Sequence, residues 1–194
     1  MTNEFFEKLV AHSEAHARFV NSLSFVEYIG ARKILKSQHA DNFSFELLSH
    51  VAEEIRHAQV LKRLALRMSD GLVTSYRPEH LLAGQEAEAY IQAIDHAVEQ
   101  EIGGEQHWKN YLLTTLVVEE RAKSFYSEYE TVLARCGYGG ILAAIVREEE
   151  GHLKKMYSWL SADQLGYEYL LGKLRKREQS AFEIFLRSAA NEIH

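Results

Sequence analysis

Two short strings of the form Glu-x-x-His constrain this chain more than any other feature of its sequence. They run from Glu54 to His57 and from Glu149 to His152, and each lies within a long stretch that has the hydrophobic period of a helix. In a helix, residues at positions i and i+3 share one face, about 4.5 Å apart along the axis. Each string can therefore place a carboxylate and an imidazole on the same metal ion.

A lone glutamate precedes each string by one predicted helix, so the chain contains a weak internal repeat of two helical hairpins. These glutamates are Glu27 and Glu119. One Glu from each of two helices, with Glu-x-x-His from each of two others, is the ligand set of a di-metal carboxylate site in a four-helix bundle. The predicted metal ligands are Glu27, Glu54, His57, Glu119, Glu149 and His152.

The helical periodicity predicts an all-α fold, a four-helix bundle with a long crossover and an additional C-terminal helix. In its connection this bundle resembles the ferritin-like bundles, which also have a long crossover. The single proline, Pro78, fits long uninterrupted helices. We expect one domain over residues 1–194, with the bundle in roughly 3–160. The predicted helices span roughly 3–38, 44–69, 85–101 (in the crossover), 105–136, 141–160 and 162–190 (the C-terminal helix).

The six candidate ligands all fall on the hydrophobic stripes of their predicted helices, which should face the core. Burying four carboxylates together without a cation would cost many kcal/mol or force their protonation. Two divalent ions would offset the four charges. The alternative is that these side chains are half-exposed charges on amphipathic helices of an interaction protein that binds no metal.

The third helix of the bundle offers two adjacent glutamates, of which only one can point inward. Glu119 shares its stripe with Leu112 and Tyr126, whereas the face of Glu120 is more polar. We therefore predict Glu119 as the ligand and keep Glu120 as the alternative.

Two further glutamates, Glu53 and Glu148, directly precede the predicted ligands of the two strings. Metal-bound histidines usually donate their second N–H to a carboxylate or a carbonyl. Glu53 could orient His152 across the bundle and Glu148 could orient His57; otherwise both are solvated surface residues.

Other histidines and a basic run lie outside the predicted ligand set. His12, His16 and His50 could guide metal ions into the site, but scattered surface histidines are the favoured interpretation. The run Lys173-Leu174-Arg175-Lys176-Arg177 is interpreted as a solvated face, with docking of an acidic electron donor as the alternative.

Composition excludes several classes of function. The net charge of −6 and the pI of about 5.9 do not favour nucleic acid or an anionic membrane as a partner. No apolar run approaches the ~18 residues of a membrane span. Cys136 is the only cysteine, which excludes internal disulfides and thiolate-bound iron sites. The first residues lack a signal-peptide pattern, so we expect a cytoplasmic protein.

The segments 53–57 and 148–152 resemble the (Asp/Glu)-Glu-x-Arg-His strings of the ferritin-like di-iron carboxylate superfamily. This resemblance implies that Glu54 and Glu149 bridge two irons. It also implies that one iron is completed by Glu27 with His57 and the other by Glu119 with His152.

The second string departs from the superfamily pattern, because Gly151 stands where Arg56 stands in the first. The later helix therefore lacks the arginine of the superfamily pattern. A glycine inside a helix costs about 1 kcal/mol relative to alanine, so we expect Gly151 to relieve crowding near the site.

The resemblance implies an oxidase or oxygenase, a di-iron carboxylate oxidoreductase that activates O2 to oxidise a small organic substrate. It implies two Fe ions as cofactors, with Mn as an option, an external electron donor protein and, as one option, a homodimer. No catalytic residue beyond the metal ligands is predicted. The alternatives are a ferroxidase or bacterioferritin-like iron-handling protein and a di-manganese or Fe–Mn redox protein, for which Tyr126 and Tyr129 could support a radical although core packing is favoured.

Overall fold

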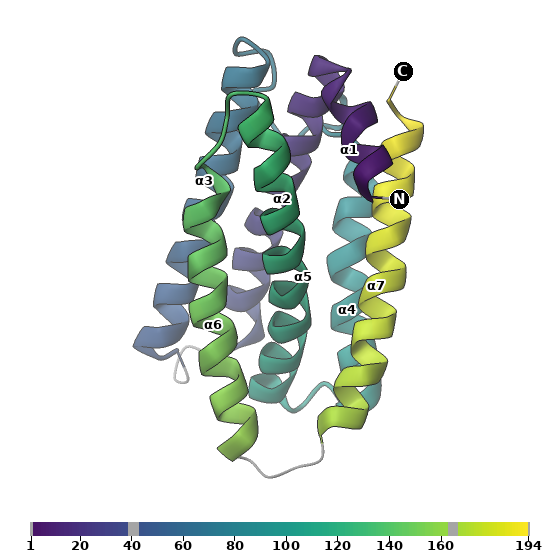
Figure 1. Ribbon diagram of the computed structural model, residues 1–194. Coiled ribbons are helices and arrows are strands. Elements are labelled where there is room, and N and C mark those ends of the chain that lie inside the picture. Colours follow the sequence, from purple (N-terminus) through teal and green to yellow (C-terminus); the bar gives the residue numbers. More distant parts are fainter. Residues whose placement is uncertain (1, 39–42, 163–166, 194) are drawn as a thin grey trace. The chain divides into compact units, whose positions relative to one another are not determined.

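The computed structural model describes residues 2–38, 43–162 and 167–193 (Figure 1). Within these ranges the chain is all-α, as predicted, and contains no strand. Its elements are α1 (Thr2–Val10), α2 (Ser13–Ser37), α3 (Phe45–Met68), the 3-10 helix η2 (Pro78–His80), α4 (Gly84–Ile102), α5 (His107–Arg135), α6 (Leu142–Ala162) and α7 (Tyr167–Asn191).

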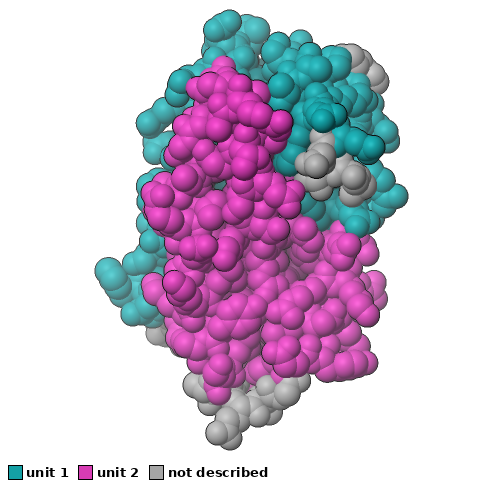
Figure 2. Space-filling view, in the orientation of Figure 1, with its two compact units in different colours: residues 1–92, 181–194 teal, residues 93–180 magenta. Residues whose placement is uncertain are grey.

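The chain divides into two compact units, which Figure 2 shows in different colours. Unit 1 comprises residues 1–92 and 181–194, and unit 2 comprises residues 93–180. Helices α2 and α3 lie in unit 1 and helices α5 and α6 lie in unit 2, whereas α4 and α7 contribute residues to both. The expectation of a single domain over residues 1–194 stays a prediction.

The first predicted helix, 3–38, is wrong as a continuous element, because the chain breaks between α1 and α2 at His12. In a continuous helix the His12 N–H would bond the carbonyl of Lys8. Instead the His12 ring donates to that carbonyl from Nδ1 at 2.9 Å, and the backbone N–H of His12 bonds the carbonyl of Leu9 at 3.1 Å. The side chain thus takes the acceptor that the next helical turn requires.

The other predicted helices lie close to the observed ones, with differences at their ends. Ser44 begins α3, since its Oγ accepts the N–H of Leu47 at 3.3 Å. The predicted start of the last helix at residue 162 differs from the structure, in which α6 continues to Ala162 and α7 begins at Tyr167. Residues 163–166, where the prediction placed the first turn, lie outside the described ranges.

Aromatic rings fill the core of unit 1. Phe19 of α2 meets Phe5 of α1 edge to face, with ring centroids 5.0 Å apart, and stacks on Phe185 of α7 at 5.8 Å. Phe185 also contacts Phe182 at 6.0 Å. Each buried ring stabilises the fold by roughly 1.5–3 kcal/mol, so the cluster fastens α1 and the end of α7 to α2.

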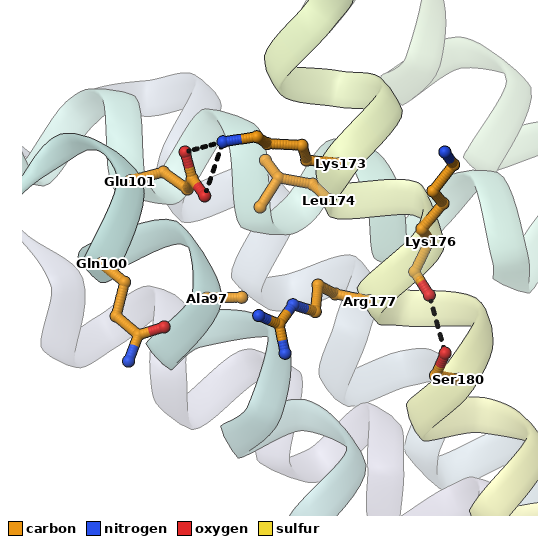
Figure 3. A pocket seen from close by; sticks show the side chains of 8 residues that line it. All are labelled: Ala97, Gln100, Glu101, Lys173, Leu174, Lys176, Arg177 and Ser180. Carbon is orange, nitrogen blue, oxygen red and sulfur yellow. Dashed lines mark hydrogen bonds and ion pairs between the residues drawn. The ribbon is translucent and has the colours of Figure 1, made fainter.

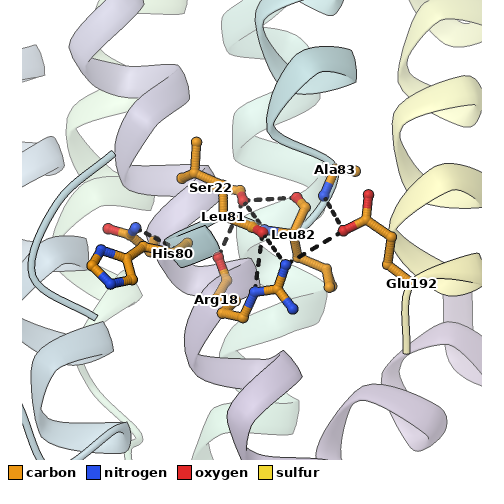
Figure 4. Close-up of polar contacts among 8 residues, drawn as sticks. Arg18, Ser22, His80, Leu81, Leu82, Ala83 and Glu192 are labelled. Atoms are coloured by element: carbon orange, nitrogen blue, oxygen red, sulfur yellow. Dashed lines mark hydrogen bonds and ion pairs between the residues drawn. The ribbon is translucent and has the colours of Figure 1, made fainter. Parts of the chain in front are cut away.

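Polar side chains of α2 hold the segment between α3 and α4 (Figure 4). Arg18 donates to the carbonyl of Leu81 from Nε at 3.1 Å and from Nη2 at 2.6 Å. The Ser22 hydroxyl accepts the N–H of Leu82 at 2.8 Å and donates to the carbonyl of that residue at 2.7 Å. These bonds satisfy the backbone of an irregular segment and fix where α4 begins.

Two carboxylates organise unit 2. The guanidinium of Arg121 on α5 donates to both oxygens of the buried Glu178 on α7, at 2.9 Å each. Glu130 of α5 accepts the N–H of Leu142 at 2.8 Å, which satisfies a backbone donor at the start of α6. Gly137, with φ of +82°, makes the left-handed turn that ends α5.

No helix in the described part of the chain combines the length and apolar character needed to cross a membrane.

Candidate metal-binding clusters

The first cluster lies in unit 1 and comprises Glu27 of α2 with Glu54 and His57 of α3; we call it the α2–α3 cluster. All three side chains are buried, with 6%, 7% and 1% of their residue surface exposed. One donor atom from each lies within 4.8 Å of the others, and His57 Nδ1 is 3.9 Å from Glu27 Oε2. The helical i, i+3 spacing brings Glu54 and His57 to one face, and α2 packs against that face.

The second cluster lies in unit 2 and comprises Glu119 of α5 with Glu149 and His152 of α6; we call it the α5–α6 cluster. These side chains are buried as well, with exposures of 3%, 1% and 8%. His152 Nδ1 lies 3.2 Å from Glu119 Oε2 and 3.4 Å from Glu149 Oε2. The two units thus each contain one buried group with the same composition, two glutamates and one histidine.

Both clusters fit a transition-metal ion. Bonds from such an ion to imidazole nitrogen and carboxylate oxygen are about 2.0–2.2 Å long, so two ligands lie about 3 Å apart when adjacent and about 4 Å apart when opposite. The donor separations of 3.2 and 3.4 Å in one cluster and 3.9 Å in the other fall in this range. A divalent ion would also balance the two carboxylate charges that each cluster buries.

The two adjacent glutamates of α5 have different surroundings. The Glu119 carboxylate faces His152, whereas Glu120 accepts hydrogen bonds from Arg175 Nε and Nη2 at 2.8 and 2.7 Å and from the Tyr157 hydroxyl. Burial alone would raise the pKa of Glu120, but the bonds from Arg175 and Tyr157 outweigh it and hold the pKa below its ordinary value. Glu120 is therefore engaged within unit 2 by partners other than the cluster, and Glu119 as the ligand stays a prediction.

The sequence interpretation of surface histidines is wrong at two of its three positions. His16 and His50 are buried, with 3% and 5% of their surface exposed. Burial lowers the pKa of His16 to about 4. His50 Nε2 lies 3.1 Å from Glu54 Oε1, so it lies directly beside the α2–α3 cluster. The signal was present in the sequence, because His50 lies four residues before Glu54 on the same stripe.

Glu53 and Glu148 are each half-buried. The hydrogen bonds predicted for them, to His152 and to His57, would join residues of different units, and they stay predictions. The expectation for Gly151 is wrong: apart from its chain neighbours and the backbone of its own helix, no described atom lies within 4 Å of the position that a Cβ would take there, so this glycine relieves no crowding.

The basic run on α7 borders a pocket of about 360 Å³ in unit 2 (Figure 3). Lys173 reaches across to both carboxylate oxygens of Glu101 on α4, at 3.3 and 3.1 Å. Leu174 of the same run is buried, and Lys176 and Arg177 are exposed on the pocket rim. The run is therefore only partly a solvated face, and docking of an acidic electron donor on it stays a prediction.

The tyrosines of the α5 stripe are core residues. Tyr126 and Tyr129 are 3% and 0% exposed, and Tyr129 packs on Phe125 with ring centroids 5.8 Å apart. Burial raises the pKa of Tyr129 well above its ordinary value, with a smaller contribution from Cys136.

Comparison with known proteins finds no family model, no curated protein and no solved structure that matches the chain. The fold and the two clusters define its class on their own. It is an all-α protein whose buried glutamates and histidines form groups that could hold metal ions.

Proposed function

We propose that the chain is a ferritin-like di-iron carboxylate oxidoreductase that activates O2 to oxidise a small organic substrate. The observation that carries the proposal is the duplicated cluster. Each unit contains one buried cluster in which two helices bring together two glutamates and one histidine of the predicted ligand set, with donor atoms at ligand-to-ligand distances. One such group is compatible with many metal sites, but two of identical composition make up the full ligand set of a di-metal carboxylate centre.

In the proposed centre the α2–α3 and α5–α6 clusters together hold two iron ions. Glu27 with His57 would bind one ion and Glu119 with His152 the other, while Glu54 and Glu149 would bridge them. The four carboxylates then carry four negative charges against the four positive charges of two ferrous ions, and both imidazoles are neutral. This charge balance would offset the free-energy cost of burying all four glutamates.

An iron pair bound by these residues would supply the redox chemistry toward O2 that no side chain of the protein can supply. The protein's own residues would hold the metals at a buried position, because all six predicted ligands are buried. Carboxylates such as Glu54 can shift between terminal and bridging positions, and the histidines give each metal one fixed ligand. In an oxygenase reaction, one oxygen atom enters the substrate and the other leaves as water, so two electrons and two protons must come from outside. An external electron donor protein is therefore part of the proposal.

The experiment that tests the proposal is a measurement of metal content per chain. The protein is purified without chelator and analysed for metals before and after anaerobic loading with Fe(II). We expect about two irons per chain, in a particle no larger than a dimer, followed by O2 consumption when a reductant is supplied. Many irons per chain in a large shell would instead support iron storage, and two manganese ions would support peroxide or radical chemistry.

A pair of variants distinguishes one shared centre from two separate sites. If Glu54 bridges both metals, Glu54→Ala should abolish binding of the pair, and Glu149→Ala should do the same from the other cluster. Lys123→Ala is the matched control, because Lys123 pairs with the exposed part of α6 at Glu150, 3.1 Å away, and is not a predicted ligand. Loss of a single iron in each variant would contradict the shared centre, and no bound metal in the parent protein would refute the function.

A further inference from the structure

A third histidine lies against a predicted bridging carboxylate. His50 Nε2 is 3.1 Å from Glu54 Oε1, and the His50 side chain is 6% exposed. The sequence His-x-x-x-Glu-x-x-His places His50, Glu54 and His57 in a row along one face of α3, because residues at i, i+4 and i+7 share a face. All three side chains are buried, so the row faces the interior rather than solvent.

The two oxygens of Glu54 have different neighbours within unit 1. Oε2 lies toward α2, since a Cβ at Gly30 would come within 3.1 Å of it. Glu27 lies one turn before Gly30 on the same face of α2. Oε1 is instead the atom beside His50. A carboxylate that bridges two metals gives one oxygen to each, and here the second oxygen has an imidazole nitrogen next to it.

We propose that His50 is a third imidazole ligand of the dinuclear centre and binds, through Nε2, the metal ion on the Oε1 side of Glu54. This inference rests on the proposed function, because it requires the metal pair. The separation of 3.1 Å equals that expected for two adjacent ligands of one ion, about 3 Å. In the metal-free protein the same contact is a hydrogen bond, in which Nε2–H donates to the carboxylate.

The additional ligand has a chemical consequence. A neutral imidazole adds a donor without adding charge, so the balance between four carboxylates and two divalent ions is unchanged. Imidazole suits iron, whereas a site dominated by carboxylates also suits manganese. His50 therefore biases the centre toward iron, which bears on the choice between a di-iron and a di-manganese protein.

The test uses Co(II), which shifts the proton resonances of the imidazoles that bind it. The protein is loaded with Co(II) alone, and the exchangeable, strongly shifted imidazole N–H resonances are recorded by NMR. We expect one resonance for each of His50, His57 and His152, and His50→Gln should remove one of them. Glutamine keeps an N–H donor toward Glu54, so the fold of the metal-free variant should be retained and is checked by circular dichroism. If His50→Gln does not fold, the smaller His50→Asn takes its place.

Two control variants make the assignment specific. His57→Gln should also remove one shifted resonance, whereas His96→Gln should remove none, because His96 is an exposed residue of α4 that bonds Gln100. Shifted resonances from His57 and His152 alone, with an unchanged spectrum in His50→Gln, would overturn the inference and leave the proposed function standing. The absence of any shifted resonance would overturn both.

A second readout does not depend on activity. The affinities for Fe(II) and Mn(II) are measured separately by competition with a chromophoric chelator. We expect His50→Gln to weaken Fe(II) binding roughly tenfold or more, with a smaller loss for Mn(II), so that the ratio of the two affinities falls. An equal loss for both metals would show that His50 only positions Glu54 and would contradict its role as a ligand.

Discussion

Gly30 of α2 lies directly against the Glu54 carboxylate of α3, since a Cβ atom at residue 30 would come within 3.1 Å of Glu54 Oε2. That separation is shorter than ordinary van der Waals contact, so any side chain at residue 30 must displace the carboxylate by a few tenths of an ångström. The glycine is thus part of what lets α2 and α3 bring Glu27 and Glu54 into one cluster.

We predict that Gly30→Ala lowers metal affinity without unfolding the protein. Displacement of the Glu54 carboxylate should weaken binding of Fe(II) or Co(II) roughly tenfold, as for other changes that misplace a ligand. Alanine also gains up to about 1 kcal/mol in helix propensity over glycine, so the metal-free protein should be no less stable. Metal titration and urea unfolding of the same samples measure the two effects.

The matched control for this prediction is Gly151→Ala on α6. Outside its own helix backbone and chain neighbours, no described atom lies within 4 Å of a Cβ at that position. The substitution should therefore raise stability by up to about 1 kcal/mol and leave metal affinity unchanged. Equal weakening of metal binding by both alanines would show that the contact at Gly30 is not the cause.

The two adjacent glutamates of α5 should respond to substitution in opposite ways. Glu119→Gln should cost metal binding, because Glu119 contributes a donor atom to the α5–α6 cluster. Glu120→Gln should keep the metals but weaken the contact with Arg175, at a cost of about 1 kcal/mol given that the Arg175 side chain is 39% exposed. Metal content and urea unfolding separate the two roles. Loss of metal in Glu120→Gln, with metal retained in Glu119→Gln, would show that Glu120 is the ligand.

Glu120 also makes a pH-dependent contribution to stability. Its folded-state pKa is lowered, so the stabilisation is fully present above the ordinary pKa of glutamate and is lost as the pH falls through the folded-state value. The stability difference between the parent protein and Glu120→Gln should therefore shrink on acidification below about pH 4.5. A difference that stays constant as the pH falls well below about 4.5 would contradict the lowered pKa of Glu120.

The sequence contained enough to predict the all-α fold and most helix bounds, because hydrophobic period and turn residues such as Ser44 act locally. It did not reveal the break at His12, which depends on a side chain competing for one backbone carbonyl. It also did not reveal the burial of His50, because a histidine on a helix can lie at the surface or in the interior and only its packing decides which. The prediction for Gly151 failed because its proximity in sequence to the predicted ligands did not produce crowding in space.

His16 should make the protein acid-sensitive at mildly acidic pH. Burial lowers its pKa from 6.5 to about 4, so the unfolded chain takes up a proton more readily than the folded one. The stability is therefore complete above about pH 6.5 and declines as the pH falls toward 4, by about 2 kcal/mol between pH 7 and pH 5. Urea unfolding of the parent protein and His16→Gln across this range measures the effect, and equal pH slopes in the two proteins would rule it out.

The bidentate ion pair between Arg121 and Glu178 should stabilise the packing of α5 against α7 whether or not metal is bound. Glu178 is 3% exposed, and both of its oxygens accept from Arg121 at 2.9 Å. Removal of the cation would leave a buried carboxylate behind, so Arg121→Ala should lower the free energy of unfolding by about 3 kcal/mol. Arg121→Lys should cost about 1–2 kcal/mol, because an ammonium cannot reproduce the planar fork.

A double-mutant cycle decides whether that cost belongs to the pair. Arg121→Ala combined with Glu178→Gln removes the cation and the buried charge together, so the double variant should be less destabilised than the sum of the two single variants. The coupling is read from urea unfolding of the four proteins without metal. Simple additivity would mean that the effect of Arg121→Ala comes from its other packing contacts. Iron content of the same variants is measured separately, and a change in it would mean that the link between α5 and α7 also supports the α5–α6 cluster.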